Sequence, residues 1–126
     1  MTDADFIETL TCVDPKPVKR KASGSPTQRS KAFLEGRGYQ VEVTERWNPF
    51  ARIRQDLFGF IDMLAIREGE ILGVQTTSRS NMSARIRKIA EHENVAAVRK
   101  AGIRIEVHGW AKDAKGRWQV RVEDIS

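Results

Sequence analysis

The residues best suited to chemistry lie within positions 60–78, FIDMLAIREGEILGVQTTS. Two strand-like runs flank a short polar turn there, and the first run is apolar on both faces except for Asp62. Side chains alternate between the faces of a strand, so pairing of the two runs would bring Asp62 near Gln75 and Thr77. A buried carboxylate without partners is strongly unfavourable. Asp62 therefore needs hydrogen bonds, a cation or a metal ion; the structural alternative is a carboxylate that caps a helix or pairs with an arginine.

Two further acids can complete a metal site around Asp62. Glu45 has the inward-facing parity of a predicted strand, and Asp56 precedes Asp62 closely in RQDLFG. Carboxylate oxygens are the ligands that hard divalent cations prefer. The structural alternatives are that Glu45 sits at a fraying strand end and that Asp56 pairs with Arg54 or Arg52.

Basic residues border this stretch on both sides, and the chain carries a net charge of +5. Lys88 lies in the predicted helix that follows, where it either reaches back toward the site or stays on the surface. Clustered arginines make phosphate contacts that do not depend on base sequence. The charge therefore predicts DNA as a partner, and the alternative is a basic surface without a polyanion. The arginines expected to bind DNA are Arg46, Arg52 and Arg54 before the stretch, and Arg79, Arg85 and Arg87 after it.

The elements that position these residues follow from caps and periodicity. Ser25 and Pro26 are typical of a helix start, and Gly36 and Gly38 of its end. Glu68-Gly69 suits a tight hairpin turn. Residues 46–56 are predicted to form a loop. Strands are predicted at 39–45, 59–66, 70–77, 103–110 and 118–122, and a helical segment from 80 to 101 that is interrupted near 91–94.

The order of these elements is α-β-β-β-α-β-β. The strands near 60 and 72 are apolar on both faces, which is typical of central strands covered by helices on either side. The later strands alternate apolar and polar residues, as edge strands do. His92 and His108 are predicted to lie on the surface, and Trp110 and Trp118 are predicted to pack on strands. The sequence therefore predicts an α/β sandwich with a central mixed sheet flanked by helices.

The domain boundary and the compartment also follow from composition. Residues 1–24 have segregated charge and little apolar content, which predicts a disordered tail before a domain at 25–126. The single cysteine, Cys12, allows no disulfide within the chain. No secretory or membrane-spanning pattern occurs, so we expect a cytoplasmic protein without membrane contact.

Taken together, the element order, an Asp in the second central strand and a polar pair one residue apart in the next strand resemble the PD-(D/E)xK nuclease superfamily. The resemblance spans about residues 25–110 and is closest to archaeal-type Holliday junction resolvases and small phage or bacterial nucleases. Asp62 matches the metal-binding Asp, Gln75 stands at the position of the acid, and Thr77 at that of the lysine, giving a variant D…QxT motif. The helix acid of many members would fall near Thr27 or Gln28, neither of which is acidic.

The resemblance implies a restriction-endonuclease-like fold and a DNA endonuclease dependent on Mg²⁺ or Mn²⁺, without a small-molecule cofactor. Asp62 and Gln75 would be metal ligands together with Asp56 or Glu45. Thr77 or Lys88 would lie near the attacking water. A homodimer is one expected assembly. The alternative is a catalytically degenerate nuclease fold that serves as a DNA- or protein-binding accessory module.

Overall fold

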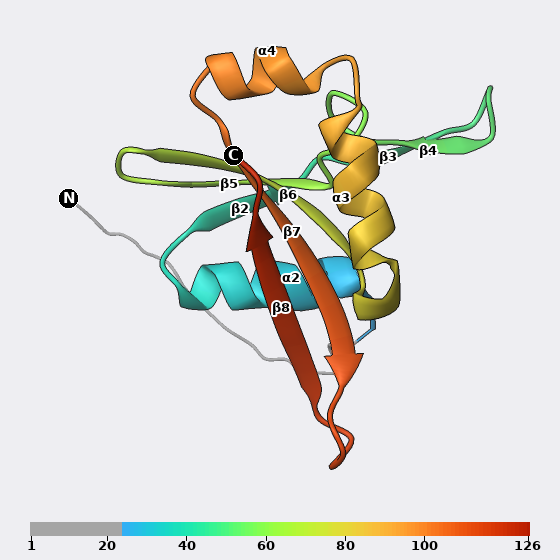
Figure 1. Cartoon of the computed structure of the whole chain (residues 1–126), viewed down its shortest axis with the longest axis vertical. Coiled ribbons are helices and arrows are strands. Elements are labelled where there is room, and N and C mark those ends of the chain that lie inside the picture. Colours follow the sequence, from blue (N-terminus) through green and yellow to red (C-terminus); the bar gives the residue numbers. More distant parts are fainter. Residues whose placement is uncertain (1–23) are drawn as a thin grey trace.

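The computed structural model describes residues 24–126 (Figure 1). The tail predicted for residues 1–24 therefore lies outside the described residues, apart from Gly24. Within the described part of the chain, no helix is long and apolar enough to cross a membrane. A five-stranded mixed sheet packs against three helices, and a small two-stranded hairpin stands beside it, so the predicted α/β class is confirmed.

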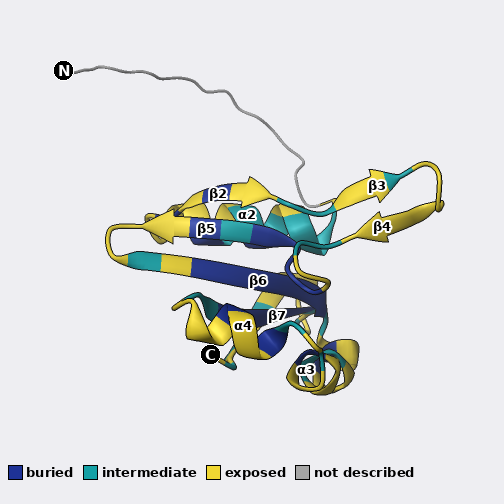
Figure 2. Ribbon diagram, turned by 90° about the horizontal axis from the view of Figure 1, so that it is seen from above, coloured by how far each residue is buried: buried dark blue, intermediate teal, exposed yellow. Residues whose placement is uncertain are grey.

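The sheet has the strand order β2-β5-β6-β7-β8, in which β6 and β7 are parallel and the other neighbours are antiparallel. The hairpin pairs β3 with β4. Helix α2 covers one face of the sheet, and α3 and α4 cover the other (Figure 2). In chain order the elements are α2 (Pro26–Gly36), β2 (Gln40–Val43), β3 (Arg46–Asn48), β4 (Ile53–Gln55), β5 (Met63–Arg67), β6 (Glu70–Ser78), the 3-10 turn η1 (Arg79–Asn81), α3 (Met82–Ala90), α4 (Val95–Lys100), β7 (Arg104–Lys112) and β8 (Trp118–Asp124).

Helix α2 begins as the sequence predicts. The Ser25 hydroxyl accepts a hydrogen bond from the Gln28 amide at 3.1 Å, and Pro26 occupies the first turn. Such a cap satisfies one of the amides that a helix start leaves without a partner. This start places Thr27 beside β6, where its hydroxyl lies 3.4 Å from that of Thr76.

Two apolar clusters hold the layers together, one on each face of the sheet. Strand β6 contributes Leu72 and Val74 to the cluster beneath α2, together with Leu34 of the helix itself. Strand β7 contributes Ile105 and Val107 to the cluster beneath α3 and α4. Because both central strands are covered on both faces, polar side chains on them are buried unless they lie at the strand ends.

Three sequence predictions about these elements are wrong. Residues 46–56 form the β3–β4 hairpin rather than a loop. Strand β7 is not an edge, because it lies between β6 and β8 and is buried on both faces. His108 is therefore fully buried instead of lying on the surface. Trp110 packs on its strand as predicted, whereas Trp118 is half-exposed and lies beneath the guanidinium of Arg29 at 3.6 Å.

His108 is accommodated by a closed set of polar contacts on the α2 side of β7. One ring nitrogen, Nδ1, lies 2.9 Å from the Ser30 hydroxyl, and the other, Nε2, lies 3.0 Å from a carboxylate oxygen of Glu106. The indole of Trp110 donates to the same Ser30 oxygen at 2.8 Å. We call these four residues the β7 cluster. Ser30 and His108 are inaccessible to solvent, so this Ser-His-Glu arrangement has no contact with a substrate.

Candidate metal centre

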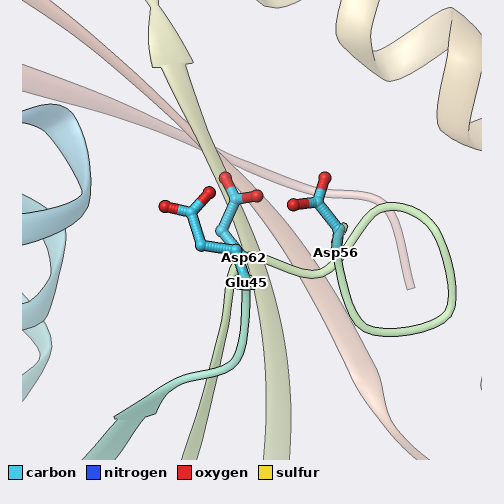
Figure 3. A group of neighbouring side chains, drawn as sticks. All are labelled: Glu45, Asp56 and Asp62. Carbon is cyan, nitrogen blue, oxygen red and sulfur yellow. The ribbon is translucent and has the colours of Figure 1, made fainter. Parts of the chain in front are cut away.

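Three carboxylates converge at one end of the central sheet, where Glu45, Asp56 and Asp62 hold ligand oxygens within 4.8 Å of one another. Figure 3 shows the three side chains pointing the same way from neighbouring backbone segments. Glu45 immediately precedes β3, and Asp56 immediately follows β4. The β3–β4 hairpin therefore emerges between two of the three acids. We call Glu45, Asp56 and Asp62 the acid cluster.

The backbone of Asp62 fixes two of these acids relative to each other. Its amide donates to the Val74 carbonyl at 2.8 Å, and its carbonyl accepts from Thr44 at 2.9 Å and from Glu45 at 3.1 Å. The sequence predicts Asp62 in the middle of a strand. Strand β5 begins at Met63, so Asp62 instead immediately precedes the strand. This position lets the Asp62 side chain contact residues of β6 that face opposite sides of the sheet.

The Asp62 carboxylate is oriented by three hydrogen bonds, all to Oδ2. Gln75 donates through Nε2 at 3.0 Å, the Thr76 amide donates at 2.8 Å, and the Thr76 hydroxyl lies at 3.3 Å. Because these donors all engage one oxygen, the Asp62 carboxylate is held in a single orientation. Gln75 therefore lies beside Asp62, as the strand pairing predicts, and contacts it as a hydrogen-bond donor.

Asp56 is carried by a strained loop that packs against the junction of α3 and α4. Phe58 has φ 55° and Gly59 φ 89°, both in the left-handed region. Asn94 donates to the Phe58 carbonyl at 3.0 Å. A Cβ at position 59 would come within 2.4 Å of His92, so only glycine fits there. Backbone strain of this kind persists only where the surroundings fix it, and it is common at functional sites.

Electrostatics in the acid cluster favour a proton or a cation. The pKa of Asp56 is raised to about 7 by burial first, then by the charge of Asp62 and a side-chain hydrogen bond with it, and by the charge of Glu45. The nearby Arg85 acts in the opposite direction. Glu45 has a partial partner in Arg54 at 3.6 Å, and this contact is exposed on the arginine side. Asp56 thus pairs with neither Arg54 nor Arg52, contrary to the structural alternative from the sequence.

Cavities open around the acid cluster. One of about 330 Å³ is lined by all three acids and also by Thr27, Thr76 and two arginines, Arg54 and Arg85. A second, of about 120 Å³, joins Asp56 and Gln75 to Arg85, Lys88 and His92. Arg85 borders both spaces. A small anion entering either space would meet a carboxylate on one wall and a cation on another.

The remaining residues singled out in the sequence separate into two groups. Arg46 lines a groove of about 810 Å³ that continues from the acid cluster along the hairpin base, and Lys88 borders the smaller cavity. Thr77 is buried on β6 and lines none of these three spaces. Arg79 reaches instead toward β8, with a guanidinium nitrogen 3.5 Å from the Gln119 carbonyl. Arg52 lies at the hairpin turn, and Arg87 is exposed on α3.

Sequence reasoning missed Thr76, Thr27 and His92. Thr76 was overlooked because strand alternation places its side chain on the face opposite Gln75, and a backbone amide leaves no mark in a sequence. Thr27 lies near the helix position where the resemblance predicts an acid. The resemblance therefore indicates this position, although the residue there is a threonine. His92 gave no signal, because its contact with Gly59 is set by the tertiary fold.

Comparison with models of known protein families, with curated proteins and with solved structures finds no match for this chain. The structure itself supports a mixed α/β fold that carries the acid cluster. The donor set suits a hard divalent cation: one oxygen of each of three carboxylates lies within 4.8 Å of the others, and burial together with the charges of its neighbours raises the pKa of Asp56. Glu45, Asp56 and Asp62 can thus hold a metal ion.

Proposed function

We propose that this chain is a divalent-metal-dependent phosphodiesterase that acts on DNA, an endonuclease of the variant D…QxT type. The observation that carries the proposal is the convergence of Glu45, Asp56 and Asp62 within 4.8 Å, in a cavity that also contains Arg54 and Arg85. Carboxylates that hold a metal beside cations that receive a phosphate are the components of phosphodiester hydrolysis.

The three acids would hold Mg²⁺ or Mn²⁺. When bound, such an ion supplies positive charge for the phosphoryl group and lowers the pKa of a nearby water. Asp62 is the best oriented ligand, because Gln75 and Thr76 fix its carboxylate. Asp56, whose pKa lies near 7, would release its proton when the cation binds. In this arrangement Gln75 is a positioning residue.

Positive charge at the site comes from Arg54 of β4 and from α3. Thr77 has no charge and faces none of the cavities, so it does not replace the lysine of the family pattern. Arg85 borders both spaces next to Asp56, and Lys88 borders the smaller one a helical turn away. We infer that Arg85 holds the phosphate and that Lys88 stabilises charge near the attacking water. Both are electrostatic roles, which contribute most where water is excluded.

A non-enzymatic function is the second candidate, and one specific observation favours it. Gln75 presents an amide hydrogen, not an oxygen, to Asp62, so β6 adds no ligand to the three acids in this geometry. Under this alternative the arginines that border the acid cluster and line the hairpin bind DNA phosphates without cleavage. The two functions differ in one measurable respect, which is turnover in the presence of metal.

The test is a metal titration coupled to a cleavage assay. Purified full-length protein would be incubated with single-stranded, duplex and branched DNA in EDTA, Mg²⁺, Mn²⁺ or Ca²⁺. We expect cleavage with Mg²⁺ or Mn²⁺ and none in EDTA, together with a rise in melting temperature when the ion is added, because a ligand of the folded state stabilises it. DNA binding without any cleavage, and without a metal-dependent rise in melting temperature, would contradict the enzyme and support the binding module.

A further inference from the structure

The β3–β4 hairpin exposes more apolar surface than its size would suggest. Figure 2 shows it standing out from the body of the molecule, with exposed residues along both strands. Trp47 is 57% exposed, Ile53 51%, and Phe50, at the tip, 97%. Large apolar side chains exposed on one small element mark interaction sites more often than chance. The hairpin is thus a candidate surface for a partner.

The charge of the hairpin indicates which partner fits it. Arg46, Arg52 and Arg54 all lie on it, and the strand register places Arg54 directly opposite Trp47. Among the described residues, Arg46 and Arg52 have no acidic partner, and Arg54 has only the contact with Glu45 at 3.6 Å. Basic side chains interleaved with exposed rings are typical of surfaces that bind nucleic acid.

The β5–β6 hairpin provides an internal reference. Strands β5 and β6 also expose apolar side chains near their turn, Ile66 and Ile71. The one arginine of this hairpin, however, is paired within the protein: Arg67 contacts Glu70 at 2.9 Å, and Glu70 also accepts from the Tyr39 hydroxyl at 2.6 Å. Exposed apolar surface is thus common to the β3–β4 and β5–β6 hairpins, and of these two the β3–β4 hairpin carries exposed aromatic rings beside arginines without a close acidic partner.

The turn of the β3–β4 hairpin fixes the direction of its tip. The side-chain oxygen of Asn48 accepts hydrogen bonds from the amides of Phe50 at 3.0 Å and Ala51 at 3.2 Å. The Asn48 carbonyl accepts from the Arg52 amide at 2.7 Å. A tip held in this way presents the Phe50 ring without a large loss of conformational freedom on binding.

The hairpin leads directly into the acid cluster. Arg46 and Arg54 form one side of the 810 Å³ groove, and the loop that carries Asp56 forms the other. Arg54 and Asp56 also line the 330 Å³ cavity that holds the three acids. A strand lying on the hairpin would therefore be led past its base and into the site.

We propose that the β3–β4 hairpin is an arm that binds single-stranded DNA, stacking unpaired bases on Trp47 and Phe50 while its arginines contact phosphates. The inference rests on the proposed function for the identity of the nucleic acid, and it specifies the substrate as DNA with an unpaired segment. In a continuous duplex the base faces are stacked on each other, so a base must be unpaired and unstacked before it can stack on a protein ring, which costs free energy. An unpaired segment does not carry the cost of unpairing.

The test compares three fluorescently labelled ligands of equal charge, measured by anisotropy in EDTA so that no cleavage occurs. They are an oligothymidylate of about 15 nucleotides, an abasic oligomer with the same number of phosphates, and a duplex of about half that length, which carries the same total number of phosphates. We expect wild-type protein to bind the oligothymidylate about tenfold or more tighter than the abasic oligomer, because each stacked base contributes about that factor. Phe50→Ala with Trp47→Ala should abolish this preference and leave abasic binding within about twofold.

The matched control is Ile66→Ala with Ile71→Ala, which removes exposed apolar side chains from the β5–β6 hairpin. It should not change the affinity for any of the three ligands. Wild-type protein that binds the abasic oligomer as tightly as the oligothymidylate overturns the arm, even if the double variant fails to fold. A duplex preference overturns it too. The proposed function fails separately: if base-dependent binding is found but no metal supports cleavage, the arm stands and the nuclease does not. Cleavage that is unaffected by the Phe50 and Trp47 changes, without base-dependent binding, supports the nuclease and refutes the arm.

Discussion

Two polar clusters are buried in this small domain, and they are built in opposite ways. In the β7 cluster each polar side chain meets a complementary one: His108 lies between Ser30 and Glu106, and Trp110 donates to the same serine. Arg104 approaches the second oxygen of Glu106 at 3.6 Å. The cluster is thus closed, with its donors and acceptors matched inside the protein.

The acid cluster gathers groups of one sign. Its three carboxylates repel each other, and the pKa of Asp56 rises to about 7 through burial, its hydrogen bond with Asp62 and the charges of both neighbouring acids. Polar groups that satisfy each other specify a fold, whereas groups that raise each other's energy persist where a ligand relieves them. The difference separates a structural network from a site, although both contain residues that are common in catalysis.

The largest expected effect breaks the acid cluster. Asp62→Asn removes the oriented ligand and should lower metal-dependent cleavage by more than about 100-fold, since loss of the outer support of a metal ligand alone has effects approaching that size. In EDTA the melting temperature should stay the same or rise, because one of three like charges is gone.

The matched control is Glu42→Gln, which neutralises an exposed acid on β2 outside the cluster. It should retain wild-type cleavage and metal-dependent stabilisation. An Asp62→Asn protein that still cleaves at the wild-type rate would show that the acid cluster is not the catalytic site.

The second effect breaks the β7 cluster. Ser30→Ala leaves the Trp110 indole and His108 Nδ1 without their shared partner, and a buried polar group without a partner costs about 1–3 kcal/mol of unfolding free energy. Urea denaturation measures the loss, with Ser83→Ala, an exposed serine on α3, as control. Metal affinity should not change. A stably folded Ser30→Ala protein that lost its affinity for Mg²⁺ would show that the two clusters are not independent.

The smallest effect sharpens the comparison through pH. The pKa of Asp56 is about 7 in the folded protein and 3.8 in an ordinary carboxyl. Between these values the metal-free folded protein retains a proton that the unfolded chain has released, so its stability falls as pH rises from about 4 to about 7. Mg²⁺ displaces that proton, and its affinity should rise over the same range and level off above pH about 7.

Melting temperatures in EDTA at the two ends of this range measure the effect. Asp56→Asn should flatten the dependence, and Glu42→Gln should leave it in place. A wild-type melting temperature that rises with pH across this range would contradict the raised pKa of Asp56, and with it the burial of Asp56 beside Asp62.

The part of the fold set by local signals could be predicted from the sequence. Caps, turn residues and periodicity correctly place the Ser25–Pro26 helix start, the Glu68-Gly69 turn and the paired strands β5 and β6. The approach of Gln75 to Asp62 follows from strand pairing. These features depend on neighbours in the sequence, which is the information that one sequence contains.

The rest depends on contacts between distant residues. The two three-residue strands on either side of Pro49 are too short to show an alternation of apolar and polar residues, so the sequence predicts a loop where the β3–β4 hairpin forms. The burial of His108 follows from parallel pairing of β7 with β6, which brings together strands separated by two helices. The sequence also offers Glu45 and Asp56 as candidates, but their convergence with Asp62 depends on tertiary contacts: Glu45 is held by the Asp62 carbonyl, and Asp56 by the strained loop that packs against His92 and Asn94.

Because the β3–β4 hairpin is attached between Glu45 and Asp56, its orientation is coupled to the positions of these two acids. Any ion that draws these two acids toward Asp62 also favours particular orientations of β3 and β4, whose ends they flank. Coupling between two binding events is reciprocal, so a strand that stabilises one orientation of the hairpin changes the affinity for the ion by the same factor as the ion changes the affinity for the strand. The proposed ion and the proposed strand would then act as effectors of each other through the hairpin itself.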